Sequence, residues 1–180
     1  MSRVQTSYND RRALRRFDGR AGYRNADRHP LRLITWATDG VNIGGMVRTA
    51  EAFMAERVYA IHQPKASAVG TDKWQPVIYG LEAIRDAIAE AQADGYTIVA
   101  LEQTTDSRML PCDLPERMCL VSGNEGSGVP ASVLASADLA IEIPQYGLVG
   151  SLNVVTATSI ALYEWASQWA TVPQQARRAA

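Results

Sequence analysis

The sequence lacks several features that would place it in a special class of protein. No apolar run approaches the roughly 20 residues that a membrane-spanning helix needs, and the opening Met-Ser-Arg-Val-Gln has no apolar signal-like stretch. The two cysteines, Cys112 and Cys119, are too few for a disulfide framework. We therefore expect a protein of the reducing cytoplasm that does not enter a membrane.

Ligands for a metal ion are also scarce. Cys112 and Cys119 could be joined only by His29 and His62, and no zinc-ligand spacing results. The G-x-G-x-x-G fingerprint of dinucleotide-binding proteins is absent, as is a phosphate loop with its lysine. We assign no metal, and a nicotinamide enzyme or another nucleotide-dependent α/β enzyme is disfavoured.

The 180 residues are enough for one domain with a sizeable core. The net charge of −1 hides a basic N-terminus, because eight arginines fall within residues 1–30. Guanidinium groups bind phosphate and stack on π faces, so this arginine-rich segment, with Tyr8, Phe17 and Tyr23 between its arginines, suits nucleic acid. The alternative is a solvated tail without a ligand. We divide the chain into an extension (1–30), a domain (31–170) and a frayed tail (171–180).

Short apolar runs alternate with helical patterns along the domain. The runs predict strands within 31–38, 57–64, 96–102, 118–123 and 139–144. The helical patterns predict helices at 46–54, 81–94 and 130–137 and one that begins near Asn153. Residues 65–80 are polar and rich in turn formers. The alternation predicts the α/β class, with a mostly parallel sheet and helices on both faces.

Polar and glycine-rich segments follow three of the predicted strands. Their sequences are "DGVNIGGMVRTA", "SGNEGSGVP" and "PQYGLVGSLN". Ligands of open parallel sheets bind outside the carboxyl ends of the strands, so these loops are candidates for chemistry. In the first loop, Gly44 and Gly45 precede Arg48 by one helical turn. Two glycines in a first turn weaken a helix, which predicts that a nucleic acid or a partner subunit approaches this backbone closely.

Each polar residue of these loops also has a purely structural interpretation. Asn42 could cap the first helix, and Arg48 could form an ordinary salt bridge with Glu51 or Glu56. Glu125 could be a plain turn residue.

Ser151 and Asn153, which precede the last helix, are both natural N-cap residues. Within that helix, Ala157, Ala161, Trp165 and Trp169 form a stripe at i+4 spacing. The stripe could pack in the core or against a second subunit.

Taken together, "NIGGMVRTA", "LVSGNEGSGVP" and "IPQYGLVGSLNVVTATSIALYE" closely resemble, in this order, the three motifs of the SpoU/TrmH-type RNA 2′-O-ribose methyltransferases of the SPOUT superfamily. The resemblance covers roughly residues 31–169. It implies a deep C-terminal trefoil knot, an exception to the rule that chains do not knot. It also implies bound S-adenosylmethionine and a homodimer with its active site near the subunit interface.

The resemblance further implies roles for individual residues. It assigns the catalytic group to Asn42, Arg48, Glu125, Ser151 and Asn153. It assigns cofactor contacts to the backbone around Leu101, Gly123, Ile143, Leu148 and Leu152. The chain departs from the family pattern at Gln145 and Val155, which removes no reacting group but leaves polar contacts near the cofactor open.

The resemblance also directs the choice of substrate. No sizeable RNA-binding domain of the kind that some ribosomal-RNA enzymes carry precedes the motifs. Substrate capture would then fall to the arginine-rich segment and the dimer surface, which favours transfer RNA, with ribosomal RNA as the alternative. A non-catalytic RNA-binding protein of the same fold is a further alternative, although all the catalytic residues that the resemblance implies are present.

Overall fold

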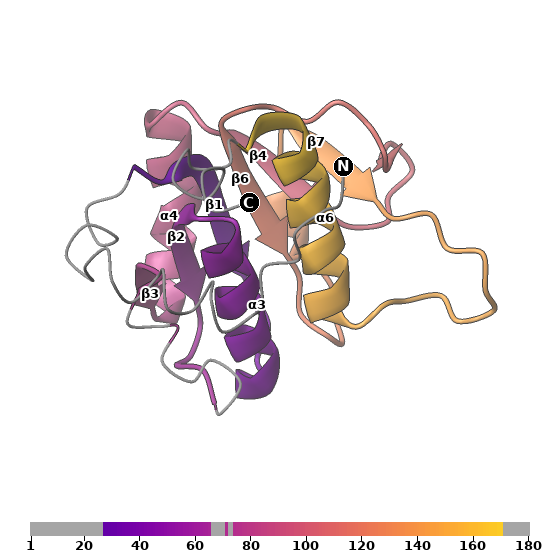
Figure 1. Ribbon diagram of the computed structural model, residues 1–180. Helices are drawn as coiled ribbons and strands as arrows, with labels where there is room; N and C mark the ends of the chain where they lie inside the picture. Colours follow the sequence, from indigo (N-terminus) through magenta and orange to yellow (C-terminus); the bar gives the residue numbers. More distant parts are fainter. Residues whose placement is uncertain (1–26, 66–70, 72–73, 171–180) are drawn as a thin grey trace, which may run out of the picture. The chain divides into compact units, whose positions relative to one another are not determined.

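The apolar runs of the chain pair into one sheet. The computed structural model describes residues 27–65, 71 and 74–170, and Arg28–Trp169 form the unit discussed below (Figure 1). The described strands are β1 (His29–Thr35), β2 (Ala55–Ala60), β3 (Val77–Tyr79), β4 (Thr97–Leu101), β5 (Arg108–Met109), β6 (Met118–Ser122) and β7 (Leu139–Glu142). They form a seven-stranded sheet in the order β3-β2-β1-β6-β4-β7-β5, and every paired neighbour is parallel.

Helices cover both faces of this sheet. They are α3 (Gly40–Ala52), α4 (Leu81–Ala93), α5 (Ala131–Leu134) and α6 (Val154–Trp169). Successive side chains of a strand point to opposite faces. Ile34 of β1 joins Ile84 and Ala87 of α4 in one core cluster, whereas Ser122 of β6 contacts Thr158 of α6. Figure 1 shows α3 and α6 in front of the sheet and α4 behind it, so the predicted α/β architecture is confirmed.

Three local features differ from the predictions. α3 begins at Gly40, six residues before the predicted start, because Asp39 caps it and accepts hydrogen bonds from the backbone N–H groups of Val41 and Asn42. β3 lies in the stretch predicted as turns, and the two-residue β5 was not predicted. β3 and β5 are the edge strands of the sheet, and both are too short to show an alternating pattern of apolar and polar residues.

The stripe on α6 packs inside the chain's own body. Ala161 and Trp165 are fully buried. The indole N–H of Trp165 donates to the carbonyls of Pro115 and Glu116, and that of Trp169 to the carbonyl of Leu114. The core interpretation is therefore confirmed for Ala161 and Trp165, whereas Ala157 is half-buried and Trp169 is 43% exposed. In the part of the chain that the structure describes, no helix is long and apolar enough to cross a membrane.

A buried arginine lies in the middle of β1, before the carboxyl end where the first loop begins. Arg32 is only 4% exposed and lies 2.6 Å from carboxylate oxygens of both Glu56 and Asp94. The Tyr96 ring packs against the guanidinium groups of Arg32 and Arg117, and its hydroxyl donates a hydrogen bond to Glu56. Burial and this hydrogen bond raise the pKa of Tyr96 to about 12.

This pKa predicts a specific loss of stability in alkaline solution. Between pH 10 and about 12 an unfolded chain has lost the proton of Tyr96 while the folded chain keeps it, so the free energy of unfolding should fall as pH rises through this window. Urea unfolding of the native protein and of Tyr96→Phe should show that the stability difference between them shrinks from pH 9 to pH 12. Tyr146→Phe, at a fully exposed ring, is the control. Parallel curves for native protein and Tyr96→Phe would contradict the assignment.

Candidate active site at the carboxyl ends of the strands

The parallel register brings the three polar loops to one edge of the sheet. Thr35 of β1 pairs with Ser122 of β6, Ser122 with Leu101 of β4, and Leu101 with Ile141 of β7. All four strands therefore end at the same level, and the segments that follow them are neighbours. This confirms the expectation that the loops share one edge.

The Glu125 carboxylate joins these loops. One of its oxygens accepts a hydrogen bond of 2.8 Å from the side-chain amide of Asn42, and the other accepts one of 3.3 Å from the backbone N–H of Thr38. The side-chain amide of Asn153 in turn donates to the Asn42 oxygen at 3.3 Å. Three of the predicted catalytic residues therefore form one hydrogen-bonded chain, which we call the Glu125–Asn42–Asn153 network.

The environment of Glu125 keeps it ionised. Partial burial acts to raise the pKa of its carboxyl group, but hydrogen bonds from Asn42 and from backbone N–H groups, including that of Thr38, lower it by more. The net pKa lies below the usual range. A carboxylate that is charged at neutral pH is a strong hydrogen-bond acceptor and a weak base, so Glu125 holds the Asn42 amide in one orientation. The plain-turn interpretation of Glu125 is therefore incomplete.

The capping interpretation has a different outcome for each of Asn153, Asn42 and Ser151. Asn153 does cap α6, because its side-chain oxygen accepts from the backbone N–H groups of Val155 and Thr156 at 2.9 and 3.4 Å. Asn42 does not cap α3, since Asp39 does so, and capping was the wrong interpretation for Asn42. Ser151 is exposed, and its hydroxyl makes no hydrogen bond within the described residues.

Gly45 permits close contact between two helices of the same chain. A Cβ atom at this position would lie 2.8 Å from a methyl carbon of Val155 on α6. One turn further along α3, the hydroxyl of Thr49 lies 3.1 Å from that of Ser159. The expectation that a nucleic acid or a partner subunit approaches this backbone is therefore corrected at Gly45, where α6 occupies the space.

Arg48 lies on the exposed surface of α3. Across the described ranges its guanidinium forms no hydrogen bond or ion pair, and the Glu56 carboxylate is engaged by Arg32. The salt-bridge interpretation is therefore not supported. Arg48 also makes no hydrogen bond to the Glu125–Asn42–Asn153 network, so the structure leaves this guanidinium available to a ligand.

Glycines shape the loop that carries Glu125. A Cβ atom at Gly123 would collide with the backbone of Gly128 and Val129, and one at Gly128, where φ is +67°, would collide with the Glu102 carboxylate. Glu102 accepts a hydrogen bond of 2.9 Å from the Val129 N–H. The sequence analysis did not select Glu102, although an acidic residue directly after a buried strand was a visible signal.

The residues predicted to hold the cofactor divide into two groups. Leu101, Gly123 and Ile143 lie at or just after the ends of β4, β6 and β7, where Gly123 is buried and the two apolar side chains are half-buried. Leu148 is fully exposed and Leu152 is 39% exposed, both in the segment between β7 and α6. Figure 1 shows this segment as an extended loop that projects from the body.

Substitution of two glycines in the loop that carries Glu125 should distinguish a crowded position from an open one by their effects on stability. Gly123→Ala should lower the free energy of unfolding by about 1–3 kcal/mol, since it forces atoms into a filled site. Gly126→Ala is the matched control, because its Cβ would meet only the Asn124 side-chain oxygen at 3.6 Å. Urea unfolding followed by circular dichroism measures both. Equal stabilities of the two variants would show that the backbone approach at Gly123 is not rigid.

Comparisons with known proteins agree with this geometry. The SpoU rRNA methylase family matches residues 33–163. A tRNA (guanosine(18)-2′-O)-methyltransferase of Mus musculus is 31% identical over 136 residues, which make up 71% of this chain and 9% of the mouse protein. The A. aeolicus TrmH/SpoU tRNA modifying enzyme has a similar structure, with a TM-score of 0.73 and 27% identity over 88% of this chain and 83% of its own.

A second solved structure, the AdoMet-bound rRNA methyltransferase of Sinorhizobium meliloti, gives a TM-score of 0.66 at 25% identity, over 81% of this chain and 59% of its own. The chain spans 9–56% of the length of the first curated relatives that it matches. The family match contains all three loops and the whole Glu125–Asn42–Asn153 network. The chain therefore belongs to the SpoU rRNA methylase family.

Proposed function

We propose that this protein is an S-adenosylmethionine-dependent RNA methyltransferase that modifies a ribose 2′-hydroxyl, in transfer RNA ahead of ribosomal RNA. The observation that carries the proposal is the Glu125–Asn42–Asn153 network, which joins the three motif loops at the edge of the sheet where ligands bind. The family membership and the relatives that act on tRNA add support.

The cofactor would lie against Leu101, Gly123 and Ile143, with the loop that carries Leu148 and Leu152 folded over it. When bound, S-adenosylmethionine supplies an electrophilic methyl group to the ribose oxygen. The protein's own part is to aim that oxygen and to stabilise charge near it. Well-oriented reacting groups can contribute roughly 7–11 kcal/mol to catalysis.

Arg48 would act as an electrostatic clamp. A guanidinium has a pKa above about 12 and is a poor base, but it binds phosphate in a bidentate fork and stabilises developing negative charge. Its exposure and its lack of a partner in the described part of the chain support this role. The Asn42 amide, oriented by Glu125, and Asn153 would fix the ribose or Arg48, and Ser151 would join them when the substrate is bound.

We infer a knotted homodimer in the cytoplasm from the same family. The structural similarity to the TrmH/SpoU enzyme supports a C-terminal trefoil knot that includes the loop before α6. Exposed apolar side chains on that loop and on α6, namely Tyr146, Leu148, Val149 and Tyr163, suit burial against a second copy.

Substitution of Arg48 tests the catalytic role. Arg48→Ala should abolish methyl transfer from labelled S-adenosylmethionine to total transfer RNA, while the Kd for S-adenosylhomocysteine stays within about twofold, since the clamp acts on substrate and developing charge. Arg48→Lys keeps the charge without the planar fork and should retain only part of the activity. A large loss of cofactor binding in Arg48→Ala would show that its role is misassigned. Transfer of label to ribosomal RNA alone by the native protein would overturn the choice of substrate.

The arginine-rich segment generates a second prediction. Most of the segment lies outside the described residues, but Arg28 belongs to the domain, because its guanidinium donates to the carbonyls of Ala55 and Trp74 and to Gln75. Deletion of residues 1–26 therefore removes seven arginines and leaves these contacts. RNA affinity and its salt dependence should both fall, because each neutralised phosphate releases counterions.

A chain of full length with those seven arginines replaced by glutamine is the matched control for the loss of length. Both variants should bind RNA more weakly than the native protein in filter-binding titrations at increasing salt, with a shallower slope of log K against log salt. An unchanged affinity and slope in both would assign the segment to the solvated-tail alternative.

A further inference from the structure

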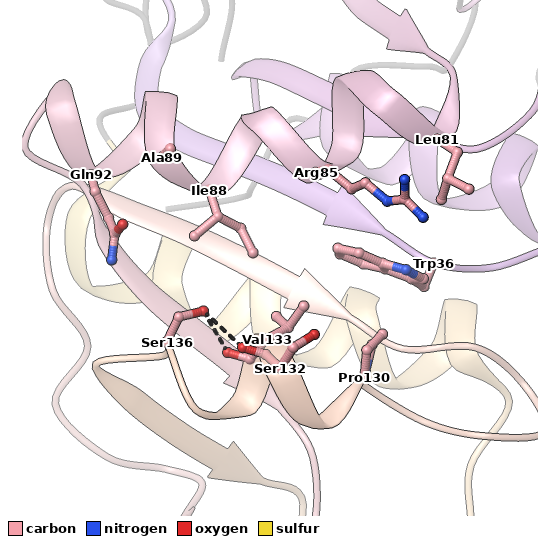
Figure 2. A pocket seen from close by; sticks show the side chains of 10 residues that line it. All are labelled: Trp36, Leu81, Arg85, Ile88, Ala89, Gln92, Pro130, Ser132, Val133 and Ser136. Carbon is pink, nitrogen blue, oxygen red and sulfur yellow. Dashed lines mark hydrogen bonds between the residues drawn. The ribbon is translucent and has the colours of Figure 1, made fainter.

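A groove outside the Glu125–Asn42–Asn153 network lies between α4 and α5 (Figure 2). It has a volume of about 430 Å³, within the range of small-molecule sites in proteins and large enough for a nucleoside. One wall is a stripe of α4 in which Leu81 and Ile88 alternate with Arg85 and Gln92. These four residues follow i, i+4, i+7 and i+11 spacing, so they share one face of the helix.

The groove begins at the carboxyl edge of the sheet. Trp36, which lines the groove, directly follows β1, and the backbone N–H of Trp36 donates to the Ser122 carbonyl at the end of β6. Two residues later, the N–H of Thr38 donates to Glu125. A single short segment thus connects the groove with the Glu125–Asn42–Asn153 network. An extended ligand could reach both.

The side chains of the groove leave polar groups without partners. Trp36 is half-buried, and Arg85, Gln92 and Ser132 are exposed. Within the residues that the structure describes, the Trp36 indole N–H and the polar side-chain groups of the other three make no hydrogen bond or ion pair, so a ligand would not have to displace a protein partner. In Figure 2 the Arg85 guanidinium lies above the Trp36 ring, and Ser132 lies on the opposite side of the groove.

This combination matches the chemistry of an unstacked nucleotide. An aromatic face accepts a base by stacking, a guanidinium binds phosphate, and amide and hydroxyl groups reach the polar edge of the base. Arg85 and Gln92 are exposed and remain open to a ligand, whereas the core-facing stripe of α4, with Ile84, Ala87 and Ala91, is apolar and fully buried.

We propose that this groove binds one nucleotide of the RNA substrate beside the nucleotide to be methylated, with its base on Trp36 and its phosphate on Arg85. The proposal rests on the proposed function, since it assigns a subsite to the same RNA. Trp36 and Arg85 lie outside the three sequence motifs, so the proposal gives the α4–α5 face its own part in substrate choice.

Two conservative variants test the subsite. Arg85→Gln keeps the length of the side chain without its charge, and Trp36→Leu keeps apolar volume without the stacking face. Each should raise the KM for total transfer RNA at least about fivefold, because Trp36→Leu removes a stacking face and Arg85→Gln removes a phosphate contact, while kcat and S-adenosylhomocysteine affinity stay near the native values. Arg85→Gln should also reduce the slope of log K against log salt by about 0.7. Arg108→Gln, at an exposed arginine outside the groove, is the matched control.

The outcomes separate this proposal from the proposed function. If the native protein methylates RNA and both groove variants equal the Arg108→Gln control, the groove proposal is overturned and the function stands. If the native protein binds RNA without methylating it, and the variants bind more weakly in filter-binding assays, the groove is supported and the catalytic proposal fails. Circular dichroism melting of Trp36→Leu checks its fold, and Arg85→Gln, at an exposed side chain, gives the decisive result should Trp36→Leu unfold.

Discussion

The site depends on a carboxylate that three loops share. Glu125 is more than 80 residues from Asn42 in the sequence, yet its oxygens hold both the Asn42 amide and the Thr38 backbone. Charge-assisted hydrogen bonds are shorter and stronger than neutral ones, and the 2.8 Å Asn42–Glu125 bond is shorter than the 3.3 Å Asn153–Asn42 bond that follows it. The loop that carries Glu125 closes tightly, because Gly123 lets its backbone approach that of Gly128 and Val129 too closely for any side chain. A tight glycine turn and a single charge together fix the geometry of the edge.

The strands and helices of the core could be predicted because each has a period that its environment imposes. The helix over Leu81–Ala93 shows its 3.6-residue repeat, and the strands buried on both faces show near-continuous apolar runs. The start of α3 could not be predicted from the same rule. Glycines at 44 and 45 indicate a loop when local propensity is considered alone, but Val155 of α6 needs the space that Gly45 leaves. Tertiary packing therefore keeps these glycines helical, although local propensity alone predicts a loop.

The site itself could be predicted as a set of residues but not as an arrangement. The spacing of the motifs indicates which loops share an edge, because parallel strands align their carboxyl ends. It does not indicate that Asp39 rather than Asn42 caps α3, or that Glu102 holds the Val129 N–H. These contacts join residues far apart in sequence, and their distances follow from the twist and register of the whole sheet. Arg48 and Ser151, both exposed, lie outside the hydrogen-bonded chain, and their assignment to the catalytic group stays a prediction.

The ion pairs that stabilise the sheet lie apart from the polar groups at its carboxyl edge. On β1 the buried Arg32, paired with Glu56 and Asp94, precedes Trp36 by four residues, roughly 13 Å along a strand. A buried charge is costly unless it is paired, so Arg32 constrains the positions of β2 and α4 relative to β1. The same placement of α4 sets Arg85 and Gln92 along the groove that begins at Trp36. The ion pair with Asp94, the C-cap residue of α4, therefore fixes one end of the helix whose other residues line the groove beyond the carboxyl end of β1.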